Sequence, residues 1–209
     1  MSRRRIPSAA LVLAAAVLAA GPPLAGFRLV RLGDGDMSPS LQPGEWALLG
    51  PGEVELGDVW LLEDPAEPGR RVLRRVLGLE GDEASWKNSR YALNGEATRI
   101  REMGRDDAGV VLAEANLWLI RIRGEDTPLS IGPVTVPPGR AWVMADERDR
   151  ALDSRWWGTV PVASLEREVW LRLGGEDAWR GAVGPNAADG PWYVPPPTDP
   201  TPAEAAQGQ

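Results

Sequence analysis

The stretch Gly33–Leu49, GDGDMSPSLQPGEWALL, carries more information about the fold than any other part of the chain. It places Asp34 and Asp36 ahead of a serine-containing segment, turns at Pro43–Gly44 and ends in the apolar run Trp46–Leu49. A Pro-Gly turn signal followed by a short apolar run predicts a β-strand. Residues two apart in an extended chain share a face, so the two aspartates could approach each other there. The stretch therefore predicts a strand preceded by two carboxylates.

Residues 28–173 repeat this pattern, in which short apolar runs are separated by turn dipeptides. The other runs are Val59–Leu62, Val72–Leu77, Trp118–Ile122 and Ala141–Met144, and the turns include Pro51–Gly52, Gly57–Asp58, Asn94–Gly95 and Pro138–Gly139. Asn94–Gly95 favours a two-residue type I′ hairpin turn. No segment here keeps a helical period, although residues 163–173 predict either a turn or a closing strand. This pattern predicts an all-β antiparallel domain.

The amino-terminal segment is basic and then apolar. Arg3, Arg4 and Arg5 precede a largely apolar stretch over residues 6–27. Its core, residues 9–20, has the length of a secretory h-region, whereas the whole stretch is just long enough to cross a bilayer as a helix. We expect residues 1–5 to form a cytoplasmic basic segment and residues 6–27 a transmembrane anchor, with an uncleaved signal as the alternative reading. Either reading exports the domain that follows.

Composition narrows the remaining possibilities. The net charge of −7, with no basic run beyond the first residues, argues against a nucleic-acid partner. The chain has no cysteine and no histidine, which excludes disulfides and thiolate metal sites, and we expect no cofactor and no metal. Residues 174–209 are rich in Pro and Gly and predict a mobile tail.

The opening stretch resembles the nucleophile box of type I signal peptidases (peptidase family S26), an S-M-x-P-T-L-x-x-G-D pattern. The matching positions are Met37, Pro39, Ser40, Leu41, Gly44 and Glu45. Residues 57–65, GDVWLLEDP, resemble the second box of this family. Residues 72–82, VLRRVLGLEGD, resemble the lysine box and keep Gly78 and Asp82. Residues 91–96, YALNGE, resemble the hairpin that follows.

Residues 146–158, DERDRALDSRWWG, resemble the last box of the family and keep Asp146, Asp153, Ser154 and Arg155. The boxes follow the order of the family, so the resemblance implies a signal-peptidase-like antiparallel β domain over residues 28–173. It also implies that residues 97–133 are a variable insertion forming a β cap, that residues 6–27 are an anchor, and that Asp153 and Arg155 act as a buttress.

The resemblance fails at the catalytic positions. The family uses a serine that a neutral lysine deprotonates, and these positions hold Asp36 and Arg74. A buried lysine can lose its proton because burial lowers its pKa, whereas a guanidinium stays protonated and has no acceptor. Asp34 replaces the serine that helps to hold the oxyanion, where an anion would repel the developing charge. We expect Asp36 and Arg74 to form an ion pair through two parallel bonds.

Two other reaction mechanisms use groups near these positions. Ser38 or Ser40 could act as a displaced nucleophile, although Lys87, the only lysine, lies in a predicted turn outside the box. Asp34 and Asp36 could instead share a proton, as in aspartic hydrolysis. An ion pair in place of the dyad is the simpler account.

Three functions fit the sequence. The first is a membrane-anchored, non-catalytic pseudopeptidase that binds an extended peptide or an exported protein. The second is an active signal peptidase that cleaves signal peptides through a displaced serine. The third is a structural subunit of a secretion or envelope complex. All three place a single-pass protein in the inner membrane, with its β domain on the periplasmic or extracytoplasmic side.

Overall fold

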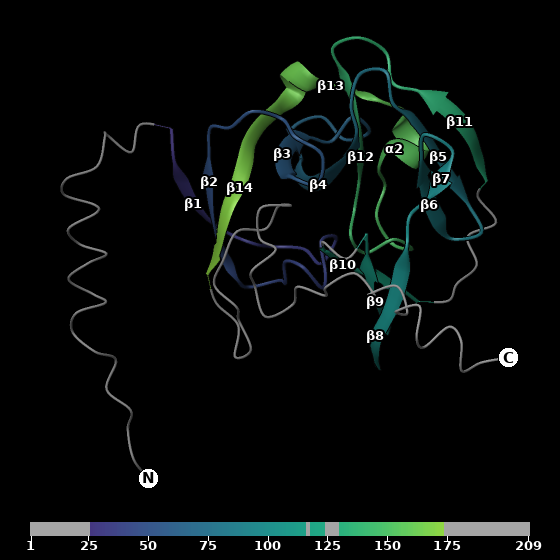
Figure 1. Ribbon diagram of the computed structural model, residues 1–209. Coiled ribbons are helices and arrows are strands. Elements are labelled where there is room, and N and C mark those ends of the chain that lie inside the picture. Colours follow the sequence, from purple (N-terminus) through teal and green to yellow (C-terminus); the bar gives the residue numbers. More distant parts are fainter. Residues whose placement is uncertain (1–25, 116–117, 124–129, 174–209) are drawn as a thin grey trace, which may run out of the picture.

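The computed structural model describes residues 26–115, 118–123 and 130–173, and these residues form an all-β antiparallel fold (Figure 1). The expectations for the segment 1–5, for nearly all of the anchor 6–27 and for the tail 174–209 lie outside the described residues. Among the residues it does describe, no helix is long and apolar enough to cross a membrane.

A seven-stranded antiparallel sheet forms the main body of the fold. Its strands, in spatial order, are β1 (Arg28–Arg31), β2 (Trp46–Gly50), β14 (Leu165–Leu173), β3 (Val59–Glu63), β4 (Arg71–Gly78), β12 (Arg140–Met144) and β13 (Val160–Pro161). The apolar runs predicted around Trp46, Val59, Val72 and Ala141 are all strands of this sheet. The order brings β4, which carries the lysine box, beside β12, which leads into the last box.

Two smaller antiparallel sheets complete the fold. One contains β10 (Trp118–Ile122), β9 (Gly109–Glu114) and β8 (Ile100–Asp106), and the other contains β11 (Ile131–Thr135), β5 (Glu83–Lys87), β6 (Arg90–Leu93) and β7 (Glu96–Ala97). The first sheet lies wholly within residues 97–133, where a β cap was expected. However, β11 pairs with β5, so the insertion does not form one separate unit.

The hairpin turns follow the predicted chemistry. Asn94 and Gly95 have φ values of 53° and 81° and connect the paired residues Leu93 and Glu96. Positive φ at both central residues is the mark of a type I′ turn, so this prediction is confirmed. Asn88 and Ser89, at φ 52° and 57°, make the equivalent turn between β5 and β6.

Near the carboxyl end of the domain, two short helices precede the last strand. The helix α2 (Ser154–Trp157) begins at Asp153, whose carboxylate accepts a hydrogen bond from the backbone N–H of Arg155. The 3-10 helix η1 (Val162–Ser164) leads directly into β14, so the predicted turn and the predicted closing strand both occur. α2 has a single turn, which is too short to leave a helical period in the sequence.

Tryptophan side chains fill much of the core, but not all of them are buried. Trp60, Trp86, Trp118 and Trp142 are buried, whereas Trp156 and Trp170 are 56% and 46% exposed. The indole N–H of Trp118 donates to Glu114 at 2.9 Å. The Nε1 atoms of four other tryptophans are buried without a hydrogen-bond partner among the described residues: Trp60, Trp86, Trp142 and Trp157.

Candidate functional site

Asp36 and Arg74 meet across the site, as expected. Asp36 lies in a turn after β1, not on a strand, and Arg74 lies in the middle of β4. The Arg74 Nη2 atom is 2.9 Å from Asp36 Oδ2, and the Arg74 side chain is 1% exposed against 19% for Asp36. The contact is a single bond, so the expectation of two parallel bonds was wrong.

The other hydrogen bonds of the Arg74 guanidinium explain why it makes a single bond to Asp36. Arg74 Nε and Nη2 donate to the carbonyl of Leu152 at 2.9 and 2.7 Å, and Nη1 donates to the carbonyl of Leu73 at 2.6 Å. The guanidinium also lies over the Trp157 ring, 5.4 Å from its centroid. Arg74 is therefore fixed by three polar partners, and its guanidinium offers hydrogen-bond donors but no acceptor.

The two aspartates do not form a proton-sharing pair. Asp34 is exposed, and its Oδ1 accepts a hydrogen bond from the backbone N–H of Asp36 at 3.4 Å. This contact is a local side-chain to backbone turn, while the Asp36 carboxylate faces Arg74. The geometry therefore gives no support to aspartic hydrolysis.

The nearby serines have structural partners. The Ser40 hydroxyl donates to the carbonyl of Leu119 at 2.9 Å and accepts from Arg75 Nη2 at 3.3 Å. Ser38 is 7% exposed, and no hydrogen bond or ion pair joins either serine to Lys87. Lys87 is exposed at the β5–β6 hairpin. A serine–lysine arrangement is therefore absent from the described residues.

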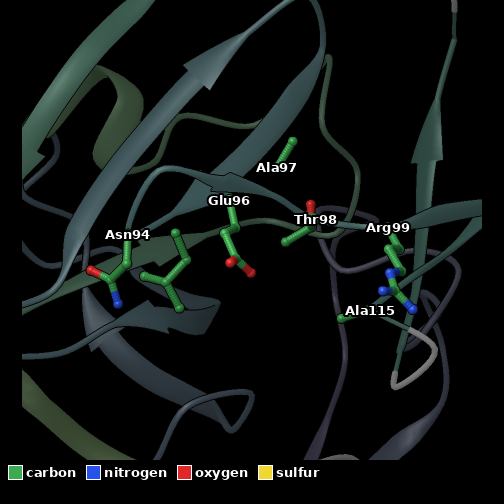
Figure 2. Close-up of a pocket in the computed structure, with 7 residues that line it drawn as sticks. Asn94, Glu96, Ala97, Thr98, Arg99 and Ala115 are labelled. Atoms are coloured by element: carbon green, nitrogen blue, oxygen red, sulfur yellow. The ribbon is translucent and has the colours of Figure 1, made fainter.

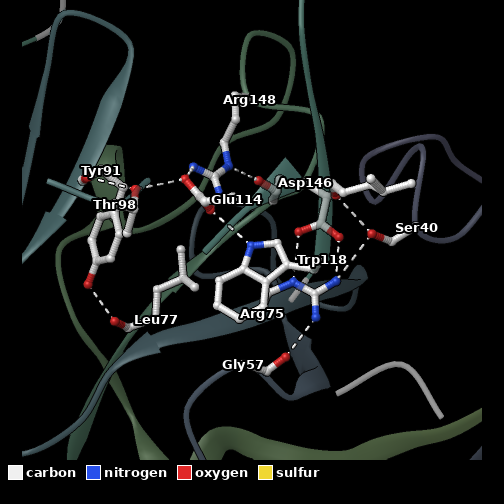
Figure 3. A network of polar contacts seen from close by, with 12 residues as sticks. Ser40, Gly57, Arg75, Leu77, Tyr91, Thr98, Glu114, Trp118, Asp146 and Arg148 are labelled. Carbon is white, nitrogen blue, oxygen red and sulfur yellow. Dashed lines mark hydrogen bonds and ion pairs between the residues drawn. The ribbon is translucent and has the colours of Figure 1, made fainter. Parts of the chain in front are cut away.

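Next to Arg74, the Arg75 side chain enters a buried polar network (Figure 3). Its Nε and Nη2 atoms donate to the two carboxylate oxygens of Asp146 at 2.9 and 2.6 Å, and neither side chain is exposed. Arg75 Nη1 donates to the carbonyl of Gly57 at 2.7 Å. The guanidinium also lies 5.1 Å from the centroid of the Trp118 ring. Arg75 thus joins the lysine-box strand to Asp146 of the last box and to Trp118 of β10.

A second buried ion pair, between Arg148 and Glu114, continues the network into the three-stranded sheet (Figure 3). Arg148 is fully buried, and its neighbouring carboxylates raise its pKa against the opposing effect of desolvation, Glu114 contributing most. Its Nε donates to the carbonyl of Ala145 at 2.8 Å. The Arg148–Glu114 pair therefore joins the last box to β9 of the three-stranded sheet.

The remaining residues of the last box fasten its loop to β12. Asp153 Oδ2 accepts from the backbone N–H of Ala145 at 3.1 Å, and Ser154 Oγ accepts from that of Val143 at 2.9 Å. Arg155 donates to both carboxylate oxygens of Asp153 at 2.8 and 2.7 Å. These hydrogen bonds support β12, which pairs with β4, the strand that carries Arg74. This is the buttress that the resemblance implied.

The other motif positions have structural surroundings. Met37 is 2% exposed in the core beside the loop, and Pro39 follows a cis peptide bond after Ser38. A side chain at Gly78 would come within 3.2 Å of Trp142 Cβ. Asp82 accepts hydrogen bonds from the Leu79 backbone at 2.9 Å and from the Asn94 amide at 2.9 Å. No group of three side chains able to ligate a metal occurs in the described ranges.

Two pockets share the loop that carries Asp36. The apolar groove has a volume of about 290 Å³. It is lined by apolar residues of the sheet and of the loop after β1, by Asp34 and by three arginines: Val30, Leu32, Met37, Leu41, Leu49, Leu61 and Leu73, with Arg28, Arg31 and Arg71. The polar pocket, about 480 Å³, is lined by Asp36 and Ser38 together with Arg121, Arg123, Glu147 and Arg150. A peptide crossing Asp36 would therefore have an apolar surface and a polar one within reach.

A third hollow, about 600 Å³, lies away from these residues, along the β6–β7 hairpin and the chain that follows it (Figure 2). It is lined by Leu93, Asn94, Glu96, Ala97, Thr98, Arg99 and Ala115. Asn94 is engaged with Asp82, and the Thr98 hydroxyl donates to the carbonyl of Tyr91 at 2.9 Å. Since no predicted site residue lines this hollow, we assign it no role.

Two carboxyl groups on another part of the main sheet have strongly raised pKa values. Burial raises the pKa of Asp58 from 3.8 to about 6. Burial, together with the charges of Asp58 and Glu55, raises the pKa of Glu168 from 4.5 to about 7. Both groups therefore change charge within the physiological pH range.

The chain matches the family of signal peptidases, peptidase S26, over residues 5–173. The protein belongs to this family. The boxes recognised in the sequence and the all-β fold agree with that membership.

Among the relatives, signal peptidase I of Pseudomonas aeruginosa is 29% identical over 158 residues, 63% of this chain and 56% of that protein. The mitochondrial ATP-independent inner membrane protease subunit 1a of Arabidopsis thaliana is 28% identical over 122 residues, 58% of this chain and 52% of that protein. The chain thus spans about half the length of these relatives. A crystal structure of a signal peptidase I from Enterococcus faecalis matches at 21% identity with a TM-score of 0.38, covering 56% of this chain and 97% of that one.

Sequence reasoning missed the residues that surround Asp36 on its polar side. Arg121 and Arg123 lie at the end of β10, and Glu147 and Arg150 lie in the last box. Backbone hydrogen bonds bring the segments together, from Glu147 N–H to the Asp36 carbonyl at 2.9 Å and from Arg121 N–H to the Asp146 carbonyl at 2.9 Å. The one available signal was the alternation of arginines in LIRIR, residues 119–123, which predicts one charged strand face.

Proposed function

We propose that this protein is an exported, membrane-anchored and non-catalytic member of the signal peptidase family, which binds an extended peptide or an exported protein without cutting it. The observation that carries the proposal is the Asp36–Arg74 ion pair at the positions of nucleophile and base. The residues 6–27 would provide the anchor, with the β domain on the extracytoplasmic side.

The chemistry of the pair supports the loss of catalysis. Acyl transfer by this family begins when a neutral base removes a proton from a hydroxyl, which then attacks the carbonyl. Arg74 donates to Asp36, Leu152 and Leu73, so it holds its protons in place and accepts none. Asp36 offers a carboxylate that is already bound by a cation. Neither the removal of the proton nor the attack on the carbonyl therefore has a group to perform it.

Peptide binding needs none of the missing groups. β1 is an edge strand of the main sheet, and an edge can take up an extended segment through backbone hydrogen bonds. The apolar groove beside it provides a place for an aliphatic side chain of that segment. Retention of the buried Arg75–Asp146 and Asp153–Arg155 pairs keeps the groove in shape.

Two measurements on the purified full-length protein test the proposal: cleavage of a pre-protein and affinity for an extended signal-peptide-derived peptide. We expect no cleavage, no labelling by serine-directed acylating inhibitors, and measurable binding. Cleavage that is abolished by Ser38→Ala or Ser40→Ala would show a displaced nucleophile and overturn the non-catalytic part. Absence of both cleavage and binding would instead favour a structural subunit of an envelope complex.

A gain-of-function variant provides a second test of the non-catalytic proposal. The double variant Asp36→Ser with Arg74→Lys rebuilds the family pair on an intact buttress, and we expect it to gain trace cleavage. The single variants serve as controls because each lacks either nucleophile or base. A double variant that folds, binds the peptide and still does not cleave shows that Asp34 at the oxyanion position also has to change.

A further inference from the structure

The polar pocket beside Asp36 concentrates positive charge in an acidic protein. Three of its lining residues, Arg121, Arg123 and Arg150, are cationic, whereas the whole chain has a net charge of −7. The two carboxylates in the lining are Asp36 and Glu147, and Asp36 is already neutralised by Arg74, which lies outside the lining. Glu147, together with Asp106 outside the lining, forms ion pairs with Arg121 and Arg123. The positive charge of the lining that has no ion pair with a described residue is therefore that of Arg150.

The arginines differ in how far they are engaged. Arg123 is held by Glu147 through Nε at 3.0 Å and Nη2 at 3.3 Å. Arg121 contacts Glu147 at 3.5 Å and also pairs with Asp106, yet its Nε is buried without a hydrogen-bond partner. Arg150 is exposed and makes no hydrogen bond or ion pair with any other described residue. A guanidinium without a partner and a buried N–H without an acceptor leave room for one more anion.

The pocket's position suggests what this anion belongs to. The loop that lines the apolar groove with Asp34 and Met37 lines the polar pocket with Asp36 and Ser38. A segment that places an aliphatic side chain in the groove would continue past Asp36 toward Arg150. The rim of the groove adds Arg28, which likewise has no ion pair with another described residue. Arginine side chains thus line both the groove and the pocket.

We infer that the polar pocket is a subsite for a carboxylate, and that the ligand of this protein is an extended segment of another protein carrying an acidic side chain next to an aliphatic one. This inference rests on the proposed function and adds the chemical class of the partner to it. The guanidinium groups would donate to the carboxylate, and such charge-assisted bonds are stronger and more directional than neutral ones.

The test uses the full-length protein in detergent and three fluorescent peptides of ten residues. All contain Ala, Val and Leu, and they differ at two positions that hold Glu, Gln or Lys. For the unmodified protein we expect the Glu peptide to bind about threefold to tenfold more tightly than the Gln peptide at low salt, as for one or two partly exposed charge pairs. Added salt should reduce this preference.

Two matched variants assign the preference to the pocket. Arg150→Glu should favour the Lys peptide over the Glu peptide, whereas Arg90→Glu, at an equally exposed arginine without a partner on β6, should leave the order unchanged. Equal binding of the Glu and Gln peptides would overturn the inference while leaving peptide binding intact. No binding of any peptide would overturn the proposed function and the inference together. If only a variant lacking residues 174–209 binds, the acidic tail of the chain is the occupant, and the assignment to another protein is wrong.

Discussion

Separating the Asp36–Arg74 pair provides the most direct test of the site. The variant Asp36→Ser removes the counter-ion of a guanidinium that is 1% exposed but leaves its bonds to the Leu152 and Leu73 carbonyls. Losing one partner of a fully buried pair costs about 3–5 kcal/mol. Asp36 is 19% exposed, and water can reach that side, so we expect about 2–3 kcal/mol. For a domain of this size this corresponds to a fall in Tm of roughly 4–12 °C.

The assay is a double-mutant cycle with the variants Asp36→Ser and Arg74→Lys, in which the free energy of unfolding is measured in urea. Tryptophan fluorescence monitors the unfolding, because the Trp157 ring lies beside the Arg74 guanidinium. The control cycle is Arg71→Gln and Glu166→Gln, an ion pair with side chains 50% and 35% exposed. The coupling energy should be about 1.5–3 kcal/mol at Asp36–Arg74 and under about 1 kcal/mol in the control. Equal coupling in the two cycles, or an Asp36→Ser variant as stable as the parent, would refute the reasoning that this partly buried ion pair stabilises the site.

Further predictions concern the network, the pH response and the topology. Asp146→Asn should destabilise the protein more than Asp36→Asn, because the Arg75–Asp146 pair is fully buried, and the order of the urea midpoints measures this. Because the folded-state pKa values of Asp58 and Glu168 are raised, their contribution to stability is complete below about pH 4 and is lost as the pH rises through about 6 and 7. Asp58→Asn should therefore increase stability at pH 8 by at most about 3 kcal/mol and flatten the pH profile, and an unchanged profile in the variant would contradict this. A reporter fused after Gln209 should be active only in the exported compartment, and cytoplasmic activity would contradict the expected topology.

The local parts of the fold were predictable because short-range chemistry determines them. The type I′ turn at Asn94–Gly95 follows from the ease with which these residues adopt positive φ. The strand runs at Trp46 and Val72 are apolar segments bounded by turn residues. In contrast, α2 gave no signal, and the exposure of Trp156 could not be read from its residue type. Both depend on how the last box lies against β12.

The sequence by itself determined the family boxes and the residues at the positions that the resemblance assigns to nucleophile and base, because these are facts of residue type and order. The proposal of a non-catalytic site starts from these residue types. Only the tertiary structure decided that Arg74 contacts Asp36 through one bond and gives its other donors to carbonyls of Leu152 and Leu73. It also decided that Arg121 of β10 and the adjacent Arg123 reach the loop of Asp36, since backbone hydrogen bonds join Arg121 to Asp146 and Glu147 to Asp36. The physical reason is that contacts between distant segments depend on strand order and register, which no local pattern specifies.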